Sequence, residues 1–176
     1  VGAALLNHTV SFQDLARFFA ELDTRDYQHC VENTKDLLAA NKASETVSCI
    51  GLDSSSEAVR FAVDVGLIDG GIARNFEDDQ NLSREEIRTI SDCNLLTSTG
   101  AIGYVGDKTL STLFNHLGNS SVDSPGPYTV VTILRMFDPA PVAATMERFG
   151  LHFAALPGIR LRQRQFGQQQ LQYLVG

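Results

Sequence analysis

Long apolar runs are absent from this 176-residue chain, which is also poor in cysteine. No stretch approaches the ~18 apolar residues that a membrane-spanning helix needs, and no segment has the pattern of a secretory signal peptide. We therefore expect a cytoplasmic protein with no membrane partner. The three cysteines, Cys30, Cys49 and Cys93, are too far apart for a metal-binding pattern, so we expect buried free thiols in a reducing compartment.

Positive charge is scarce as well, with 14 Lys and Arg against 21 Asp and Glu and a formal net charge of −7. An acidic surface repels phosphate backbones, so we expect no nucleic-acid partner. A local basic patch at residues 160–164 is the one exception that the sequence leaves open.

The common signature motifs are missing too. The chain has no P-loop, no nucleophile elbow and no zinc-ligand pattern. Its histidines, His8, His29, His116 and His152, are scattered, and no pair has the spacing of metal ligands. We therefore expect no metal site, and the motifs identify no catalytic residue.

What the chain does have is an alternation of helix and strand patterns. Ser11 and Asp14 have the spacing of a capping box and predict a helix over residues 11–22, and Thr24 is expected to cap the next helix. Further helices are predicted over residues 24–40, 55–65, 83–90, 107–117 and 139–149. Strands are predicted over residues 46–52, 71–75, 94–97, 128–136, 151–156 and 159–166.

This order predicts an α/β fold. We expect a single domain over residues 1–176, with a doubly wound, Rossmann-like and mostly parallel sheet. Only Pro157 and Gly158 separate the last two predicted strands, which indicates a C-terminal antiparallel hairpin. Sheets of this kind bind ligands at the carboxyl ends of their strands, so the candidate residues are those that follow each strand.

Two candidates follow the first two predicted strands. Asp53 could accept hydrogen bonds from both hydroxyls of a ribose, could cap the next helix, or could do both. In the loop at residues 75–79, Phe76 could stack on an adenine and Glu77 could hydrogen-bond to it. The alternative for this loop is a solvated acidic surface.

Two more candidates follow the later strands. Residues 97–104 combine small hydroxyl side chains with two glycines, which let a ligand approach the backbone closely, and this favours a site over a simple tight turn. Arg135, at the end of the strongest strand pattern, could face a cleft or could pair with a surface acid.

Taken in order, these segments resemble a class I S-adenosylmethionine-dependent methyltransferase of a poorly characterised bacterial subgroup. Residues 50–62, IGLDSSSEAVRFA, are similar to that family's second strand and helix. Residues 66–72, GLIDGGI, with residues 76–78, FED, are similar to its third strand and adenine loop. Residues 98–105, STGAIGYV, resemble the segment after its fourth strand, and the C-terminal pattern resembles its final pair of strands.

The resemblance implies S-adenosylmethionine as the cofactor. It also implies that Gly2 lies in the helix that follows the family's glycine-rich motif. The cofactor-binding residues that it implies are Gly2, Asp53, Ser54, Phe76, Glu77, Ser98, Thr99 and Gly100. Tyr104 and Arg135 are the candidate contacts to the substrate.

The family's first strand and its glycine-rich loop have no counterpart in this sequence. We therefore expect the fold to start late, with the strands at residues 46–52 and 94–97 flanking either an empty slot or a strand that the sequence lacks. The segment before residue 46 is longer than one crossover helix needs. Residues 7–44 are therefore interpreted as a helical cap or insertion that covers the active site.

These patterns lead us to expect methyl transfer to an unidentified small molecule, with the acceptor atom and the oligomeric state left open. A non-catalytic methyltransferase-like scaffold or binding domain is the first alternative. A nicotinamide-dependent oxidoreductase is the second, because Asp53 would also suit the ribose of that cofactor. The predicted C-terminal hairpin argues against this second alternative.

Overall fold

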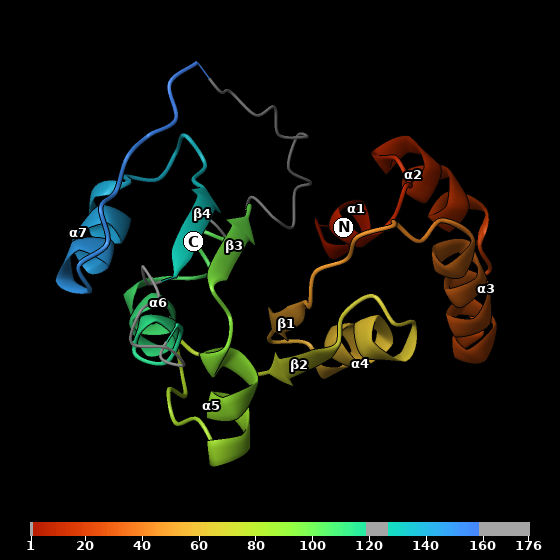
Figure 1. Cartoon of the computed structure of the whole chain (residues 1–176), viewed down its shortest axis with the longest axis horizontal. Coiled ribbons are helices and arrows are strands. Elements are labelled where there is room, and N and C mark those ends of the chain that lie inside the picture. Colours follow the sequence, from red (N-terminus) through yellow and green to blue (C-terminus); the bar gives the residue numbers. More distant parts are fainter. Residues whose placement is uncertain (1, 119–126, 159–176) are drawn as a thin grey trace. The chain divides into compact units, whose positions relative to one another are not determined.

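A computed structural model describes residues 2–118 and 127–158 of the chain. These residues belong to two compact units, of which unit 1 is Val1–Cys93 and unit 2 is Asn94–Gly176. Each unit is described by itself below (Figure 1). The single domain over residues 1–176 stays a prediction.

Unit 1 contains three helices before its first strand and two βα segments after them. The helices are α1 (Gly2–Asn7), α2 (Phe12–Glu21) and α3 (Tyr27–Ala40). They are followed by β1 (Ile50–Asp53), α4 (Ser56–Asp64), β2 (Gly70–Ala73) and α5 (Arg84–Ser91). The predicted helical segment at residues 7–44 thus contains α2 and α3, and its role as a cap over an active site stays a prediction.

Local capping sets most of the helix starts. The predicted capping box of α2 is confirmed, because the Asp14 backbone N–H donates to Ser11 Oγ at 3.1 Å and the Ser11 N–H donates to Asp14 Oδ2 at 3.0 Å. The predicted start of the second helix is wrong. Helix α3 begins at Tyr27 and is capped by Asp26 rather than by Thr24.

A salt-bridged turn moves the start of α3 along the chain. The carboxylate of Asp23 accepts hydrogen bonds from the Arg25 side chain at 2.8 and 2.7 Å, and these bonds hold residues 23–25 outside the helix. The same contacts, together with the Arg25 backbone N–H, lower the pKa of Asp23 to about 2.

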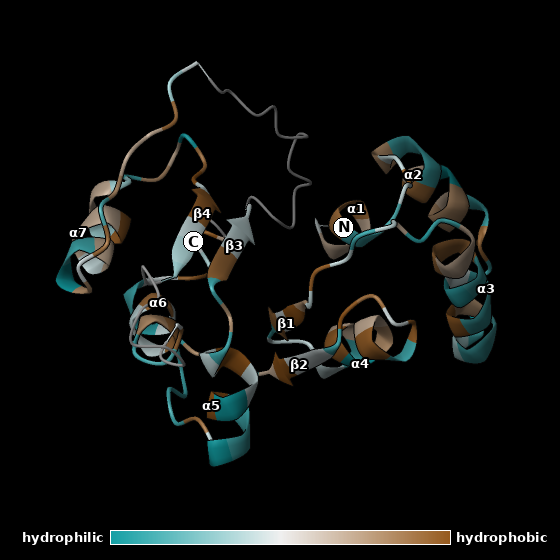
Figure 2. Cartoon of the chain, viewed as in Figure 1, coloured by the Kyte–Doolittle hydropathy of each residue, from teal (hydrophilic) through white to brown (hydrophobic). Residues whose placement is uncertain are grey.

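The core of unit 1 lies between helices α1, α2 and α3 and the C-terminal end of α4. One cluster joins Ala4, Val10 and Leu15, and a second joins Val31, Leu38 and Val65. Leu67 packs against both clusters, so the turn after α4 is tied to α1, α2 and α3. Helix α5 is mostly hydrophilic by comparison (Figure 2).

Strand β1 starts later than the sequence pattern predicts. The Asn7 side chain donates to the Val47 carbonyl at 2.8 Å and accepts from the Val47 N–H at 2.9 Å. Asp69 Oδ2 accepts from the Cys49 N–H at 2.8 Å. Because these side chains occupy the backbone groups that a neighbouring strand would use, regular pairing begins only at Ile50.

The two strands of unit 1 pair in parallel, with Ile50 opposite Gly70 and Asp53 opposite Ala73. Glycine at the paired positions 51 and 71 lets side chains approach closely. A Cβ on Gly51 would lie 2.6 Å from Ile68 Cδ1, and a Cβ on Gly71 would lie 2.5 Å from Val59 Cγ1 of α4. Helix α4 therefore packs against this face at a distance that only glycine permits.

Unit 2 repeats the strand–helix order. It consists of β3 (Leu95–Thr99), α6 (Asp107–Phe114), β4 (Tyr128–Thr132) and α7 (Ala140–Arg148). The strands pair in parallel, with Leu95 opposite Tyr128 and Thr99 opposite Thr132. Helices α6 and α7 pack together through buried apolar side chains, namely Leu110, Leu113, Phe114, Val142 and Met146.

One face of the β3–β4 pair has exposed apolar side chains in the described part of unit 2. Leu95, Tyr128 and Val130 are 48%, 66% and 51% exposed. The register places Leu95 opposite Tyr128, and alternation of side chains along a strand puts Val130 on the same face. Parallel sheets usually have both faces covered, so this face departs from the usual pattern.

The α/β class and the parallel pairing agree with the predictions, but a doubly wound sheet is not confirmed. Within residues 2–118 and 127–158, β1 is hydrogen-bonded only to β2 and β3 only to β4, giving two small parallel sheets. The sequence pattern places strands near β1, β2, β3 and β4, but it does not determine which strands become neighbours.

The antiparallel hairpin is not confirmed either. Residues 151–156 form no strand, and Leu156 is 66% exposed. An extended segment becomes a strand only when a neighbour takes up its backbone hydrogen bonds, and no described residue pairs with this one. The predicted second strand, at residues 159–166, lies outside the described residues.

Gly71→Ala tests the close packing of α4 on the strands. The added methyl group would lie 2.5 Å from Val59 Cγ1 and 3.1 Å from the Gly51 carbonyl oxygen. We expect urea denaturation to show a loss of about 1–3 kcal/mol in unfolding free energy. Gly2→Ala is the control, because a Cβ there meets nothing within 4 Å, and it should leave the stability unchanged or slightly raised. A double-mutant cycle with Val59→Ala should show coupling, and additive effects would contradict the packing described here.

Candidate functional site

Asp53 ends β1 and is exposed. Its Oδ1 accepts from the Ser55 backbone N–H at 2.8 Å, while Ser55 itself caps α4 by accepting from the Ala58 N–H at 3.1 Å. The cap of α4 is therefore Ser55, and Asp53 supports the turn that precedes it. Within the described residues Asp53 Oδ2 makes no hydrogen bond, so this oxygen is free to accept one from a ligand.

The loop after β2 lies at the same strand edge as Asp53. The parallel register places Ala73 beside Asp53, and the Arg74 backbone N–H donates to the Asp53 carbonyl at 2.9 Å. The loop closes on Asn75, whose carbonyl accepts from the N–H groups of residues 78 and 79. Asn75 Oδ1 also accepts from the Glu77 N–H at 3.1 Å. Asp53 and the start of the loop that carries Glu77 therefore lie at the same end of the two strands, and the roles of Asp53, Ser54 and Glu77 in cofactor binding stay predictions.

Phe76 does not have the environment that stacking on an adenine requires. Its side chain is only 4% exposed, so the ring packs inside the unit. Glu77 is half-buried and stays close to Asn75. A loop next to a small sheet can supply either a core residue or a ligand contact, and the sequence pattern does not distinguish these roles.

Arg74 fixes this loop to α5, and the sequence analysis did not identify it. Its Nη2 lies 2.9 Å from Glu86 Oε1 and 3.2 Å from Oε2, and its Nη1 pairs with Asp79. Glu86 also accepts from the Ser83 backbone N–H at 2.7 Å, completing a capping box. The hydrogen bond from Ser83 and the charge of Arg74 lower the pKa of Glu86. A signal for this ion pair was available in the sequence. Arg74 directly follows a strand, and the capping-box glutamate Glu86 comes later in the chain.

The corresponding edge of unit 2 contains the other predicted segment. Thr99 ends β3, and Gly100, with φ of +71°, donates its N–H to Thr132 Oγ1 at 2.8 Å. Gly103 has φ of +119°, and a Cβ there would lie 2.5 Å from the ring of Phe137. Both glycines are therefore needed by the turn itself, which supports the interpretation of residues 97–104 as a tight strand-to-helix connection.

Unit 2 contains three further predicted site residues. Ser98 Oγ is buried and has no hydrogen-bond partner within the described part of the chain. Tyr104 is 39% exposed in the turn before α6, and Arg135 is exposed after β4. Arg135 forms no ion pair among the described residues, so the pairing with a surface acid that its position allowed is not seen there.

Gly2 lies in the first turn of α1, where an added Cβ would meet nothing within 4 Å. Nothing in the packing requires a glycine at this position. The helix that the sequence predicted at the start of the chain is present, but the role of Gly2 in cofactor binding stays a prediction.

Two cavities of unit 1 lie away from Asp53. The first is apolar and is lined by residues of α1 to α4 together with Leu67. The second, of about 260 Å³, is polar and lies at the amino end of β1; its lining residues are Asn7, His8, Lys42, Thr46, Val47, Ser48, Gly66 and Asp69. Neither cavity includes a predicted cofactor-binding residue.

Comparison of the chain with protein-family models, curated protein sequences and solved structures finds no match. Within residues 2–118 and 127–158, no group of three or more His, Cys, Asp and Glu side chains is placed to hold a metal ion. The three cysteines are free, with Cys30 buried and the other two half-buried. No helix of the described ranges is long and apolar enough to cross a membrane.

Glu86→Gln tests the anchoring of the loop that follows β2. The amide keeps the size of the side chain but removes the charge that faces Arg74, and we expect a loss of about 1–3 kcal/mol in unfolding free energy at pH 7. The Glu86 pKa is lowered from its ordinary value of 4.5, so this contribution is present above pH 4.5 and is lost as the pH falls through the folded-state pKa.

The difference between wild type and Glu86→Gln in urea denaturation should therefore shrink in acid. Glu85→Gln is the matched control, because Glu85 is exposed one residue earlier on α5 and makes no side-chain ion pair among the described residues. An equal loss of stability in both variants at pH 7 would contradict the anchoring role of Glu86.

Proposed function

We propose that this chain binds S-adenosylmethionine at the carboxyl edge of β1 and β2 and takes part in methyl transfer to a small molecule. One observation carries the proposal. The exposed carboxylate of Asp53 stands at the end of a parallel strand, immediately before a capped helix, with one oxygen free of hydrogen bonds in the described chain. In doubly wound α/β folds, an acid near the end of a strand can accept hydrogen bonds from the ribose hydroxyls of a bound nucleotide.

The residues at this edge fit the nucleoside in part. A carboxylate is an acceptor only, and the two ribose hydroxyls are donors, so Asp53 and a ribose are complementary. The exposed Ser54 adjoins this site. The buried ring of Phe76 does not fit a stacking role, which leaves Glu77 and the loop backbone as the candidate contacts to adenine.

When bound, S-adenosylmethionine supplies a methyl group on a positively charged sulfur. The proposed contribution of the chain is positioning, which can supply much of the rate of a transfer between two bound molecules. Asp53 would hold the ribose at the site in unit 1. Cofactor contacts from Ser98, Thr99 and Gly100 and substrate contacts from Tyr104 and Arg135, all in unit 2, stay predictions from the sequence, and no general base is assigned.

The small-molecule acceptor and a cytoplasmic location belong to the same proposal. A net charge of −7 disfavours a nucleic-acid acceptor, because binding of phosphate backbones depends on positive charge. Cysteines that remain free suit a reducing compartment.

Isothermal titration of the chain with S-adenosylmethionine and S-adenosylhomocysteine tests the proposal. We expect both to bind, and Asp53→Asn to weaken binding by about tenfold or more, since hydrogen bonds to a charged group are worth roughly 1.5–3 kcal/mol. Asp36→Asn, on the exposed side of α3, makes the same change of charge and should leave the affinity unchanged.

Other outcomes would point to the alternatives. If neither compound binds to a folded sample, a non-catalytic binding domain is favoured. If NADH binds instead, and Asp53→Asn weakens that binding, a nicotinamide-dependent oxidoreductase is favoured. Equal losses in Asp53→Asn and Asp36→Asn would show that charge alone, and not the ribose contact, is responsible.

A further inference from the structure

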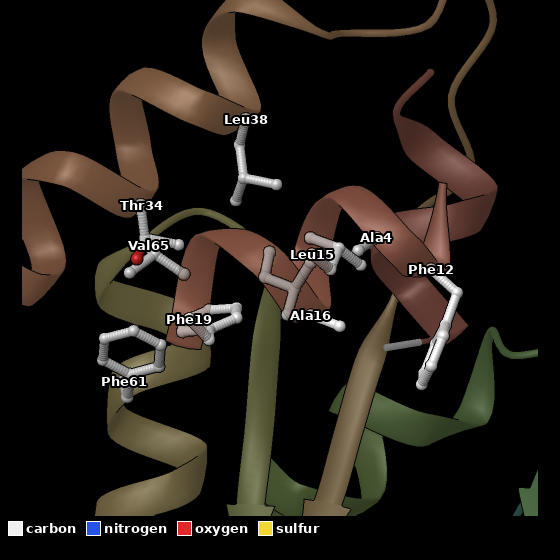
Figure 3. Close-up of a pocket in the computed structure, with 10 residues that line it drawn as sticks. Ala4, Phe12, Leu15, Ala16, Phe19, Thr34, Leu38, Phe61 and Val65 are labelled. Atoms are coloured by element: carbon white, nitrogen blue, oxygen red, sulfur yellow. The ribbon is translucent and has the colours of Figure 1, made fainter. Parts of the chain in front are cut away.

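The apolar cavity in unit 1 has the properties of a binding site, and it is separate from the edge that carries Asp53. It has a volume of about 160 Å³. The ten residues that line it are Ala4, Phe12, Leu15, Ala16, Phe19, Thr34, Leu38, Phe61, Val65 and Leu67 (Figure 3). Phe61, which lines the cavity, lies in the second half of α4, whereas Asp53 lies before the N-terminus of that helix.

Helix α2 leaves this cavity incompletely filled. Its apolar face turns Leu15 into the core, where the side chain is 6% exposed, but Phe12 and Phe19 on the same face remain 63% and 42% exposed. These two phenyl rings are exposed to solvent at the border of the cavity, and they form an apolar surface that a ligand could contact. In Figure 3, Phe19 and Phe61 lie toward one end of the cavity and Phe12 toward the other.

Thr34 is the polar member of the lining, and its hydroxyl lacks a partner. The residue is 4% exposed, and its Oγ1 has no hydrogen bond within the described residues. Other buried helical threonines behave differently, since Thr112 donates to the Lys108 carbonyl at 2.8 Å and Thr145 donates to the Pro141 carbonyl at 2.9 Å. A buried hydroxyl without a partner costs free energy, and a ligand could supply the missing hydrogen bond.

We propose that this cavity binds a small neutral molecule with one aromatic ring and one hydroxyl or carbonyl group, which hydrogen-bonds to Thr34 Oγ1. The size fits one ring, because an apolar cavity of about 150 Å³ accommodates benzene. None of the ten lining residues is charged, so a charged ligand would lose its hydration without compensation. The three phenylalanines offer their rings to an aromatic partner.

Phenol and benzene are the probes, and the chain is titrated with each while NMR follows its methyl resonances. We expect both to shift the resonances of lining residues, with a dissociation constant for phenol of about 1 mM or tighter. Thr34→Val keeps the shape and removes the hydroxyl. It should weaken phenol binding about five- to tenfold and leave benzene binding unchanged.

Two matched controls separate binding from folding. Ala16→Leu fills the cavity from an exposed position on α2 and should abolish the binding of both probes, whereas Ala20→Leu, on the same helix but outside the lining, should not. Thr112→Val removes a buried hydroxyl in unit 2 and should leave the binding of phenol unchanged.

Three results would overturn the proposal. One is the absence of phenol-induced shifts in a folded wild-type sample, as would follow if water or another protein segment filled the cavity. Another is equal binding in wild type and Ala16→Leu, which would place the bound probe elsewhere. The last is unchanged phenol affinity in Thr34→Val, which would remove Thr34 as the polar contact. None of these measurements depends on S-adenosylmethionine.

Discussion

Parallel pairing between β1 and β2 is the constraint on which unit 1 depends. The pairing sets Asp53 beside Ala73 and so brings the two following loops to one edge. Packing of Ile68 and of Val59 from α4 against the paired strands leaves little room for a Cβ at positions 51 and 71. Helix α4 can then lie against the strands with its N-terminus directly after Asp53.

Features that depend on a few neighbouring residues could be predicted from the sequence. The capping box of Ser11 and Asp14 is an example, because its hydrogen bonds join residues three apart. Thr24 was a reasonable cap by type, but the Asp23–Arg25 ion pair moved the helix start to Tyr27. That ion pair is local, but the type of residue alone does not show which of two neighbouring caps is used. Strand β1 was shortened by a distant side chain, Asn7, which is forty residues before Val47. A tertiary contact such as this one leaves no local pattern.

The candidate site also has features that could be predicted from the sequence and features that could not. Alternating strands and helices were enough to predict that Asp53 and the loop after β2 follow neighbouring ends of parallel strands. The burial of Phe76 could not be predicted, because an aromatic residue in a loop suits either a core or a ligand. The missing partner of Thr34 was also beyond prediction, since the hydroxyl of a helical threonine normally bonds to the preceding turn. Which strands become neighbours likewise depends on contacts distant in sequence, and here only two small parallel pairs form within the described residues.

Arg74 links the end of β1 to α5. Its backbone N–H holds the carbonyl of Asp53, and its guanidinium holds Glu86 on α5. A change at Arg74 leaves the half-buried charge of Glu86 without its cation, which is costly for the fold. Positions 74 and 86 should therefore vary together during evolution, and a relative that lost the cation should also have lost the acid. Paired changes of this kind in relatives would indicate that the contact between Arg74 and Glu86 is maintained.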